Sequence, residues 1–335
     1  TTKCLLCGKA AELKSETVPG YQEPDLFSVY HCPHCSTAFS FPRVDAGEIY
    51  NLIYSRGKEV SSYHRYWQQK EDVIIAKSPI DYLKNAEETY WSVITTIENS
   101  IDDKQNAQIL EVGCGMGYLT YALNTAGYNV TGLDISQEAV NEANRSFGEH
   151  YIAADIYKYA PNNTAKYDIV VLTEVIEHIE TPTEFLQQLV SMLKPDGKVL
   201  VTTPNKIFAD NVVWNSDLPP VHTWWFSEKS FEYIASKINC NVSFVDFRKF
   251  YKSKKPVYIY LNINQIQTHR FRKNSQIMNS EWKGAAPSLR QTIKNSELYK
   301  RFKSLLLPHI LYKAGKKGNF LCAIFTIDKK TLSTN

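Results

Sequence analysis

A doubly wound α/β fold with a mostly parallel sheet is predicted from three features of the sequence. A short apolar run at 109–112 suits a buried parallel strand. Gly113, Gly115 and Gly117 follow it at once, and a helical pattern starts after them. Further predicted strands come downstream. In such a fold the ligand lies beyond the carboxyl ends of the strands, against this turn, where glycines let backbone and ligand approach closely.

The glycine turn has the spacing G-x-G-x-G, with Glu111 two residues before Gly113. A dinucleotide fingerprint would need a small residue where this chain has Tyr118 or Thr120. An acid followed by this spacing resembles motif I of the class I S-adenosylmethionine (SAM) methyltransferases. The carboxylate suits a ligand that carries an ammonium and a sulfonium better than it suits a pyrophosphate. The alternative is a strand–turn–helix without a ligand, since a lone glycine motif is a weak signal.

The remaining strands are expected, in order, at 128–136, 151–157, 167–179 (running into a helix) and 193–205. Asp134 ends the second strand, where an acid can accept hydrogen bonds from both ribose hydroxyls. Asp155 lies at the tip of the third strand, and in the resembled family that acid contacts the adenine amino group. Five elements in family order extend the resemblance over 106–250, against the alternative of an unrelated Rossmann-like domain.

The resemblance implies a Rossmann-like, doubly wound, seven-stranded sheet whose last strand, 319–330, is antiparallel. It also implies a set of cofactor-binding residues along the carboxyl edge of the sheet. These are Glu111, Gly113, Cys114, Gly115, Gly117, Asp134, Ile135, Asp155, Ile156 and Thr173.

Two C-x-x-C pairs near the N-terminus predict a zinc-ribbon-like module over 1–44. The pairs are Cys4 with Cys7 and Cys32 with Cys35, and together they could complete a tetrahedral four-thiolate site. So short a segment has little core, so the metal would supply folding energy. Because four protein ligands leave no open position, the zinc would be structural. Two disulfides are the alternative, and His31 or His34 could replace a cysteine ligand.

Residues 45–105 read as mainly helical, with a helix start at Ser78-Pro79 and helical spacing through 80–101. In the resembled family this region covers cofactor and substrate like a lid. The polar aromatic run 63–67 (YHRYW) could line a pocket. It could equally provide packing between the zinc module and the main domain.

A candidate metal site follows the fourth strand. On a helix, Glu174, Glu177 and His178 would stand at i, i+3 and i+4 on one face. His222 lies in a loop after the fifth strand, at the same edge of the sheet. The E-x-x-E-H string with a later histidine resembles the O-methyltransferases of ubiquinone synthesis and the small-RNA 2′-O-methyltransferases. In the RNA enzymes the matching residues bind Mg or Mn, which would lower the pKa of an acceptor hydroxyl and orient it.

Two alternatives to that metal remain: His178 as a metal-free general base, or acids that merely cap a helix. Beyond the site, 226–238 predicts a helix capped by Ser227, and 241–251 predicts a strand. The aromatic cluster around His222 could stack on an acceptor or belong to the core. Its members are Trp214, Trp224, Trp225 and Phe226.

Charge is distributed unevenly along the 335 residues. Residues 251–318 carry 15 Lys or Arg against two acids, so this segment is +13 in a chain of net charge +3. The basic amphipathic stretch 298–318 could contact anionic lipid, a phosphorylated substrate or RNA, or it could be a solvated helical hairpin at the sheet edge. No run of 18 apolar residues predicts a membrane span, and no signal pattern precedes the module. A cytoplasmic location, with a peripheral place at a membrane as an option, is expected.

The combined reading is a SAM-dependent methyltransferase in four parts. These are a zinc module (1–44), a helical lid or linker (45–105), a SAM-binding domain (106–261 with 319–335) and a basic helical insertion (262–318). The expected reaction is metal-assisted O-methylation of a small molecule or glycan, which could be phosphorylated or lipid-linked. The alternatives are an RNA ribose 2′-O-methyltransferase and, less favoured, a non-catalytic SAM- or zinc-binding scaffold.

Overall fold

The computed structural model describes most of the chain outside the basic insertion. The described residues are 2–56, 59, 64–206, 218–253, 268–271, 277–280 and 320–328. Tyr63, Trp214 and the amphipathic stretch 298–318 lie outside them. Within the predicted helical insertion, β12 (Thr268–Phe271) and β13 (Ile277–Ser280) pair as antiparallel strands, so the helical prediction is wrong for these two segments. Among the described residues, no helix has the length and apolar character needed to cross a bilayer.

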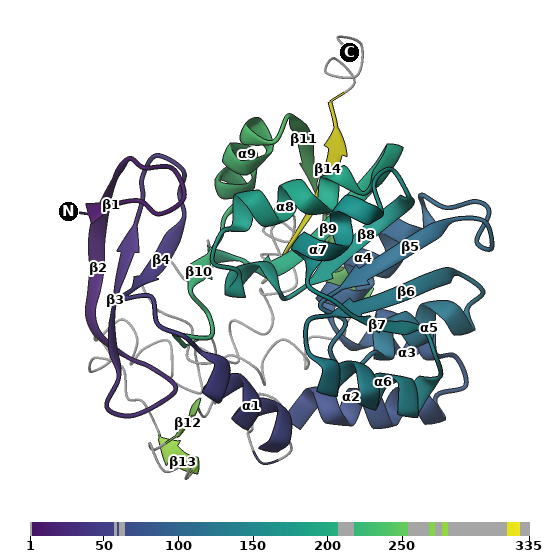
Figure 1. Ribbon diagram of the computed structural model, residues 1–335, viewed down its shortest axis with the longest axis horizontal. Coiled ribbons are helices and arrows are strands. Elements are labelled where there is room, and N and C mark those ends of the chain that lie inside the picture. Colours follow the sequence, from purple (N-terminus) through teal and green to yellow (C-terminus); the bar gives the residue numbers. More distant parts are fainter. Residues whose placement is uncertain are drawn as a thin grey trace.

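The predicted glycine turn lies at the centre of a seven-stranded sheet in the order β11-β14-β9-β8-β5-β6-β7 (Figure 1). The strands are β5 (Gln108–Val112), β6 (Asn129–Asp134), β7 (Tyr151–Ala153), β8 (Tyr167–Thr173), β9 (Leu193–Pro204), β11 (Cys240–Phe244) and β14 (Phe320–Ile327). Neighbours from β9 to β7 are parallel, whereas β14 is antiparallel to both β9 and β11. The predicted doubly wound fold, with its antiparallel last strand, is therefore confirmed.

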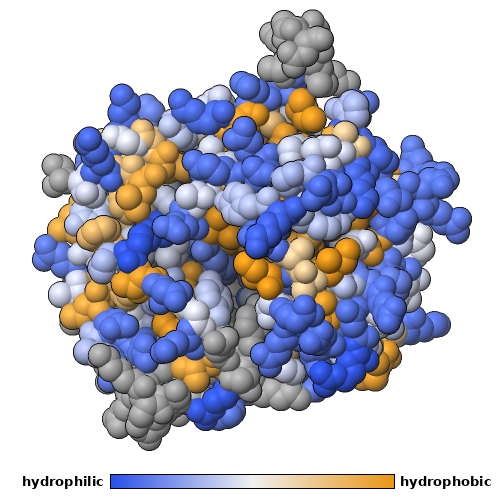
Figure 2. All heavy atoms as spheres, in the orientation of Figure 1, coloured by the Kyte–Doolittle hydropathy of each residue, from blue (hydrophilic) through white to orange (hydrophobic). Residues whose placement is uncertain are grey.

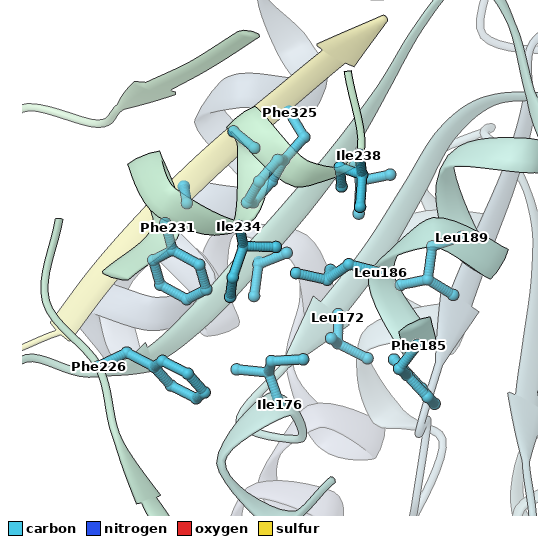
Figure 3. Packing of buried hydrophobic residues seen from close by; sticks show 14 of the residues in the cluster. Leu172, Ile176, Phe185, Leu186, Leu189, Phe226, Phe231, Ile234, Ile238 and Phe325 are labelled. Carbon is cyan, nitrogen blue, oxygen red and sulfur yellow. The ribbon is translucent and has the colours of Figure 1, made fainter. Parts of the chain in front are cut away.

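Both faces of this sheet are covered, which explains the unbroken apolar runs of its central strands. On β5, Leu110 and Val112 enter one core and Ile109 enters the other, because successive side chains of a strand point to opposite faces. The helices α8 (Pro182–Ser191) and α9 (Glu228–Lys237) cover the first face (Figure 3). The second face is covered by α3 (Pro79–Ala86), α4 (Glu88–Glu98), α5 (Tyr118–Thr125) and α6 (Gln137–Phe147).

Helix ends follow local side-chain chemistry. Ser78 caps α3 and Ser227 caps α9, as the sequence predicts, and the structure adds a reciprocal capping box between Ser227 and Ser230. The helical stretch after Pro79 is not continuous, because Glu87 has an extended backbone between α3 and α4. The strand predicted over 241–251 is wrong beyond Phe244. There Asp246 accepts a hydrogen bond from the amide of Arg248 at 3.0 Å, and α10 (Arg248–Ser253) begins.

The N-terminal module is a small antiparallel sheet that the main domain completes. Its own strands are β1 (Thr2–Lys3), β2 (Ala10–Pro19), β3 (Leu26–His31) and β4 (Ala38–Phe41). The fifth strand, β10 (Trp224–Trp225), comes from the chain just after His222 and pairs with β4. Trp224, Trp225 and Phe226 are all buried, so the core interpretation of these aromatic residues is confirmed.

Trp224 holds the module against the main domain. Its ring packs on Phe39 and stacks on Phe226, and its Nε1 donates to the carbonyl oxygen of Ile179 at 2.7 Å. We expect Trp224→Ala to lower the free energy of unfolding by about 3–5 kcal/mol, as a large-to-small change in a core does. Urea denaturation measures this, with Ile75→Ala (81% exposed) as a control that should change little. Equal stabilities of both variants would contradict this role.

Candidate functional site

The glycine turn opens at the point where the strand order of the sheet reverses. From β5 the chain proceeds to β6 on one side, while β8 lies on the other side, and ligands of doubly wound folds bind at this point. A Cβ on Gly113 would approach Val175 Cγ2 to 2.5 Å, whereas a Cβ on Gly115 would meet nothing within 4 Å. Gly115, at φ +49°, thus presents its backbone to open space, as a cradle for a ligand requires.

Asp134 connects the second strand to this turn. Its carboxylate accepts hydrogen bonds from the amides of Gly115 at 2.8 Å and Ser136 at 2.9 Å, and burial raises its pKa. The next residue, Ile135, is 79% exposed, so its side chain is available to a ligand. Asp155 caps the short helix α7 (Ile156–Tyr159), accepting from the amide of Tyr157 at 2.9 Å.

Not every predicted cofactor residue is exposed to a ligand. Ile156 and Cys114 are 5% and 7% exposed and pack in the hydrophobic cores, so a ligand could reach them chiefly through their backbone. Glu111 is 2% exposed and accepts from Thr120 Oγ1 at 2.6 Å. This hydrogen bond supports the turn from the interior. Burial raises the pKa of Glu111 to about 8, against the opposing effect of the Thr120 hydrogen bonds.

Glu177, His178 and His222 meet beyond the end of β8. Each offers a donor atom, and these atoms lie within 4.8 Å of one another. The two imidazole rings stand edge to face, 4.5 Å apart. His178 Nδ1 lies 2.8 Å from the carbonyl oxygen of Val221, and since a carbonyl only accepts, Nδ1 carries the proton. Nε2 is then the unprotonated nitrogen of His178, the one that could act as a base or a ligand, and the backbone of Glu174 also interacts with this imidazole.

Backbone contacts hold this cluster together. Thr223 donates from both its amide (3.0 Å) and its hydroxyl (3.2 Å) to the carbonyl oxygen of Glu177. The Glu177 carboxylate is 1% exposed and accepts from Thr203 Oγ1 at 2.9 Å. Burial lowers the pKa of His178, and it lowers that of His222 well below the usual value. Both imidazoles are therefore neutral at pH 7.

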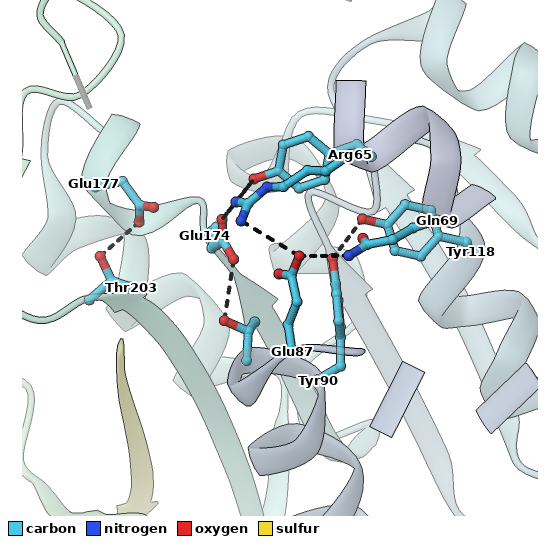
Figure 4. Close-up of polar contacts among 10 residues, drawn as sticks. Arg65, Gln69, Glu87, Tyr90, Tyr118, Glu174, Glu177 and Thr203 are labelled. Carbon is cyan, nitrogen blue, oxygen red and sulfur yellow. Dashed lines mark hydrogen bonds and ion pairs between the residues drawn. The ribbon is translucent and has the colours of Figure 1, made fainter. Parts of the chain in front are cut away.

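Glu174 does not join this cluster, so the prediction that it shares one helical face with Glu177 and His178 is wrong. Its backbone is left-handed (φ +53°), and only a single 3₁₀ turn, η3 (Ile176–His178), follows. The carboxylate instead accepts from Tyr66 Oη at 2.8 Å and Thr89 Oγ1 at 3.2 Å (Figure 4).

Glu174 thereby connects the sheet to the helix α2 (His64–Ile75). Arg65 on α2 pairs with Glu174 at 3.3 Å and with Glu87 at 3.5 Å, and Gln69 donates to Glu87 at 2.6 Å (Figure 4). Arg65, Gln69 and Glu87 also line a cavity of about 670 Å³. Part of the predicted aromatic run therefore lies over the end of β8. Nothing in the sequence indicated Glu87 or Thr89 as partners, since neither belongs to a motif.

The four N-terminal cysteines converge as predicted. Cys4 Sγ lies 3.7 Å from Cys35 Sγ, and Cys7 Sγ lies 3.5 Å from Cys32 Sγ. Sulfurs at about 2.3 Å from one tetrahedral zinc ion would lie about 3.8 Å apart. All four are free thiols rather than disulfides, and the hydrogen bond with Cys4 lowers the pKa of Cys35 to about 4.

The sequence of the central part of the chain matches a known protein family. Residues 82–243 match the family described as "Methyltransferase domain". That stretch of the chain is a methyltransferase domain. The ubiquinone biosynthesis O-methyltransferase of Rickettsia bellii is 34% identical over 117 residues, which cover 34% of this chain and 49% of that protein. The enzyme of the same name from Actinobacillus pleuropneumoniae is 34% identical over 108 residues, 30% of this chain and 46% of that protein. The chain thus spans about half the length of these relatives.

Solved structures also align with the methyltransferase domain and its surroundings. A SAM-dependent methyltransferase of Thermotoga maritima, titled a possible histamine N-methyltransferase, is 12% identical and covers 83% of this chain and 99% of its own, with a TM-score of 0.45. A SAM-dependent methyltransferase of Archaeoglobus fulgidus is 14% identical and covers 69% and 91%, with a TM-score of 0.41.

Burial of Glu111 makes a prediction about pH. The pKa of Glu111 is about 8 in the folded chain, whereas the ordinary value is 4.5, so folding favours the protonated carboxyl group. This protonated form is lost as the pH rises between these two values. The contribution of Glu111 to the free energy of unfolding is therefore complete below pH 4.5 and lost above pH 8. We expect Glu111→Gln to gain stability relative to the unsubstituted protein from pH 5 to pH 8, by a few kcal/mol at about 1.4 kcal/mol per pKa unit.

Urea denaturation at several pH values measures this difference. The control is Glu12→Gln, since the Glu12 side chain is 56% exposed and should give a difference that stays flat with pH. A flat difference for Glu111→Gln as well would contradict the raised pKa.

Proposed function

We propose that this chain is a SAM-dependent O-methyltransferase whose acceptor is a small molecule or a glycan. The observation that carries the proposal is the cluster of Glu177, His178 and His222 beside the glycine turn. The methyltransferase domain and the O-methyltransferases among its relatives support it.

In this proposal the glycine turn, Asp134 and Asp155 hold the cofactor. Open space at Gly115 fits a ligand that approaches the backbone, and Ile135 and Thr173 flank the position from neighbouring strand ends. The cofactor supplies an electrophilic methyl group when bound. The chain's contribution is to hold the acceptor oxygen in line with that methyl group, because alignment can remove much of such a barrier.

His178 is the residue best placed to take the acceptor's proton. Its Nδ1 proton is engaged by Val221, which leaves the Nε2 lone pair as the proton acceptor. Burial lowers the pKa of His178, so the imidazole stays neutral and able to act as a base near pH 7. His222, edge to face with His178, confines the orientation of the ring.

In its more specific form, the proposal includes a divalent metal bound at the same cluster. Glu177, His178 and His222 would hold it, and the metal would lower the pKa of an acceptor hydroxyl. The residue types fit, since two neutral imidazoles and a buried carboxylate offer donor atoms that lie within 4.8 Å of one another. Without Glu174 the set has one carboxylate, which favours manganese over magnesium, because imidazole is a poorer ligand for magnesium.

Activity tests the metal and the acceptor together. We expect release of S-adenosylhomocysteine with hydroxylated sugars or catechol-like rings, faster with Mn²⁺ than with Mg²⁺ and suppressed by brief chelation. Glu177→Gln and His178→Ala should lower kcat by about 100-fold or more. Glu149→Gln, an exposed acid in the loop between α6 and β7, is the control and should keep its activity.

Two results would overturn parts of this proposal. Turnover indifferent to chelator, with the module still folded, would remove the metal and leave His178 as the base. Methylation of nitrogen or carbon acceptors alone would contradict O-methylation, and short RNA as the preferred acceptor would contradict the small-molecule or glycan class.

We further propose that Cys4, Cys7, Cys32 and Cys35 bind structural zinc. Their spacing suits one tetrahedral ion, and all lie on the turns that join β1 to β2 and β3 to β4. We expect about one zinc per chain by elemental analysis, and we expect Cys35→Ser to lose the zinc and lower the Tm. Cys240→Ser is the control, because Cys240 lies outside the cluster. Purified protein without zinc, and a Cys35→Ser variant as stable as the control, would contradict the site.

A further inference from the structure

Arg43 is a partly buried cation that has no carboxylate partner among the described residues. It lies between β4 and α1 (Gly47–Arg56), with its guanidinium carbon 4.3 Å above the ring of Trp224. Its Nη2 is buried, and the described part of the chain offers it no hydrogen-bond acceptor. By contrast, every other arginine whose side chain is described pairs with a carboxylate. These are Arg56, Arg65, Arg145 and Arg248.

The surroundings of Arg43 do not neutralise it. Burial lowers the pKa of Arg43 to about 10, while Glu180 opposes the shift through space. No ion pair joins the two among the described residues. A buried charge is costly unless it is paired and hydrogen-bonded. Stacking on Trp224 occupies one face of the guanidinium, so an oxyanion would be bound through its in-plane donors.

Arg43 lies on a chain segment that contacts the segments carrying His178 and His222. Trp224, beneath the guanidinium, is two residues beyond His222, and its Nε1 bonds the carbonyl oxygen next to His178. Further along the chain from Arg43, the ring of Tyr50 on α1 lies edge to face with the imidazole of His178, with the ring centroids 6.0 Å apart. Both ends of the segment that carries Arg43 therefore contact the polypeptide that carries the two histidines. The surface is hollowed between the module and the ends of the sheet (Figure 2).

We propose that Arg43 binds an oxyanionic group, phosphate or carboxylate, of the methyl acceptor. This assignment deepens the proposed function and rests on it for the identity of the acceptor, whereas the anion site can be tested without turnover. A guanidinium donates two parallel hydrogen bonds to either group, and hydrogen bonds between charged partners are the stronger kind. The acceptor class narrows accordingly to anionic small molecules or glycans. The alternative is a purely structural role, here called a brace, in which Arg43 only holds the Trp224 ring in place.

Thermal denaturation in phosphate or chloride at equal ionic strength separates these roles. Phosphate should raise the Tm of the unsubstituted chain by a few degrees, as a ligand of the folded state does. Arg43→Met should lose that response and, without phosphate, melt at or above the unsubstituted Tm, because an unpaired buried charge has been removed. Arg43→Lys should keep part of the response. Arg145→Met is the matched control: Arg145 is 74% exposed, and its variant should respond like the unsubstituted chain.

The brace predicts the opposite pattern. If phosphate has no effect on the unsubstituted protein, or if Arg43→Met retains the full phosphate response, the anion site is wrong. A lower Tm for Arg43→Met in chloride, with no phosphate response in any variant, would assign the brace.

Kinetics then connect the anion to the acceptor. Arg43→Met should raise KM about 10- to 100-fold for a phosphorylated or carboxylated acceptor and leave KM for its neutral analogue unchanged. An unchanged KM for the anionic acceptor, beside an Arg43-dependent phosphate response, would mean that the site holds free phosphate and would overturn the acceptor assignment. An Arg43-dependent response in a protein that methylates nothing would reject the proposed function while the anion site stands.

Discussion

The two hydrogen bonds from Thr223 to the carbonyl oxygen of Glu177 are the contact on which the whole site depends. They connect the turn after β8 to the loop that carries His222, so two histidines that are well separated in sequence meet. The same loop continues directly into β10, which pairs with β4 of the cysteine module. The proposed zinc module and the proposed catalytic cluster thus share one short stretch of backbone.

The left-handed backbone of Glu174 divides the polar residues at the end of β8 into two groups. Such a φ is unfavourable for a residue with a Cβ, and it persists here because Arg65, Tyr66 and Thr89 hold the carboxylate. One group, around Glu174, anchors helix α2. The other, around Glu177, faces the histidines. A straight helix at this position would have merged the groups and left α2 without its anchor, so the strained residue keeps the contacts of α2 apart from the histidine cluster.

The sheet and its order could be predicted because each central strand is an apolar run beside a turn or cap that local chemistry specifies, such as Gly113–Gly117 or Ser227. The four cysteines could be predicted because their spacing alone brings each pair onto one turn. The placement of Glu174 could not, since a string such as T-E-V-I-E-H fits a helix and a 3₁₀ turn equally well. Its outcome depends on Arg65 and Thr89, which lie 109 and 85 residues away. Arg43 gave no signal either, because only the fold shows that the described residues offer it no counterion.

Electrostatics at the site connect these parts. Burial keeps His178 and His222 neutral, so the pair can accept a proton or bind a metal but cannot offset the charge of an anionic acceptor. Arg65 cannot offset it either while Glu87 and Glu174 neutralise its guanidinium. Among the described arginines, only Arg43 has a positive charge without a carboxylate partner. If the acceptor is anionic, its charge therefore lies on the side of the cysteine module, and its hydroxyl points away from the module, towards His178 and the glycine turn. The module would then form one wall of the acceptor pocket in addition to its structural role.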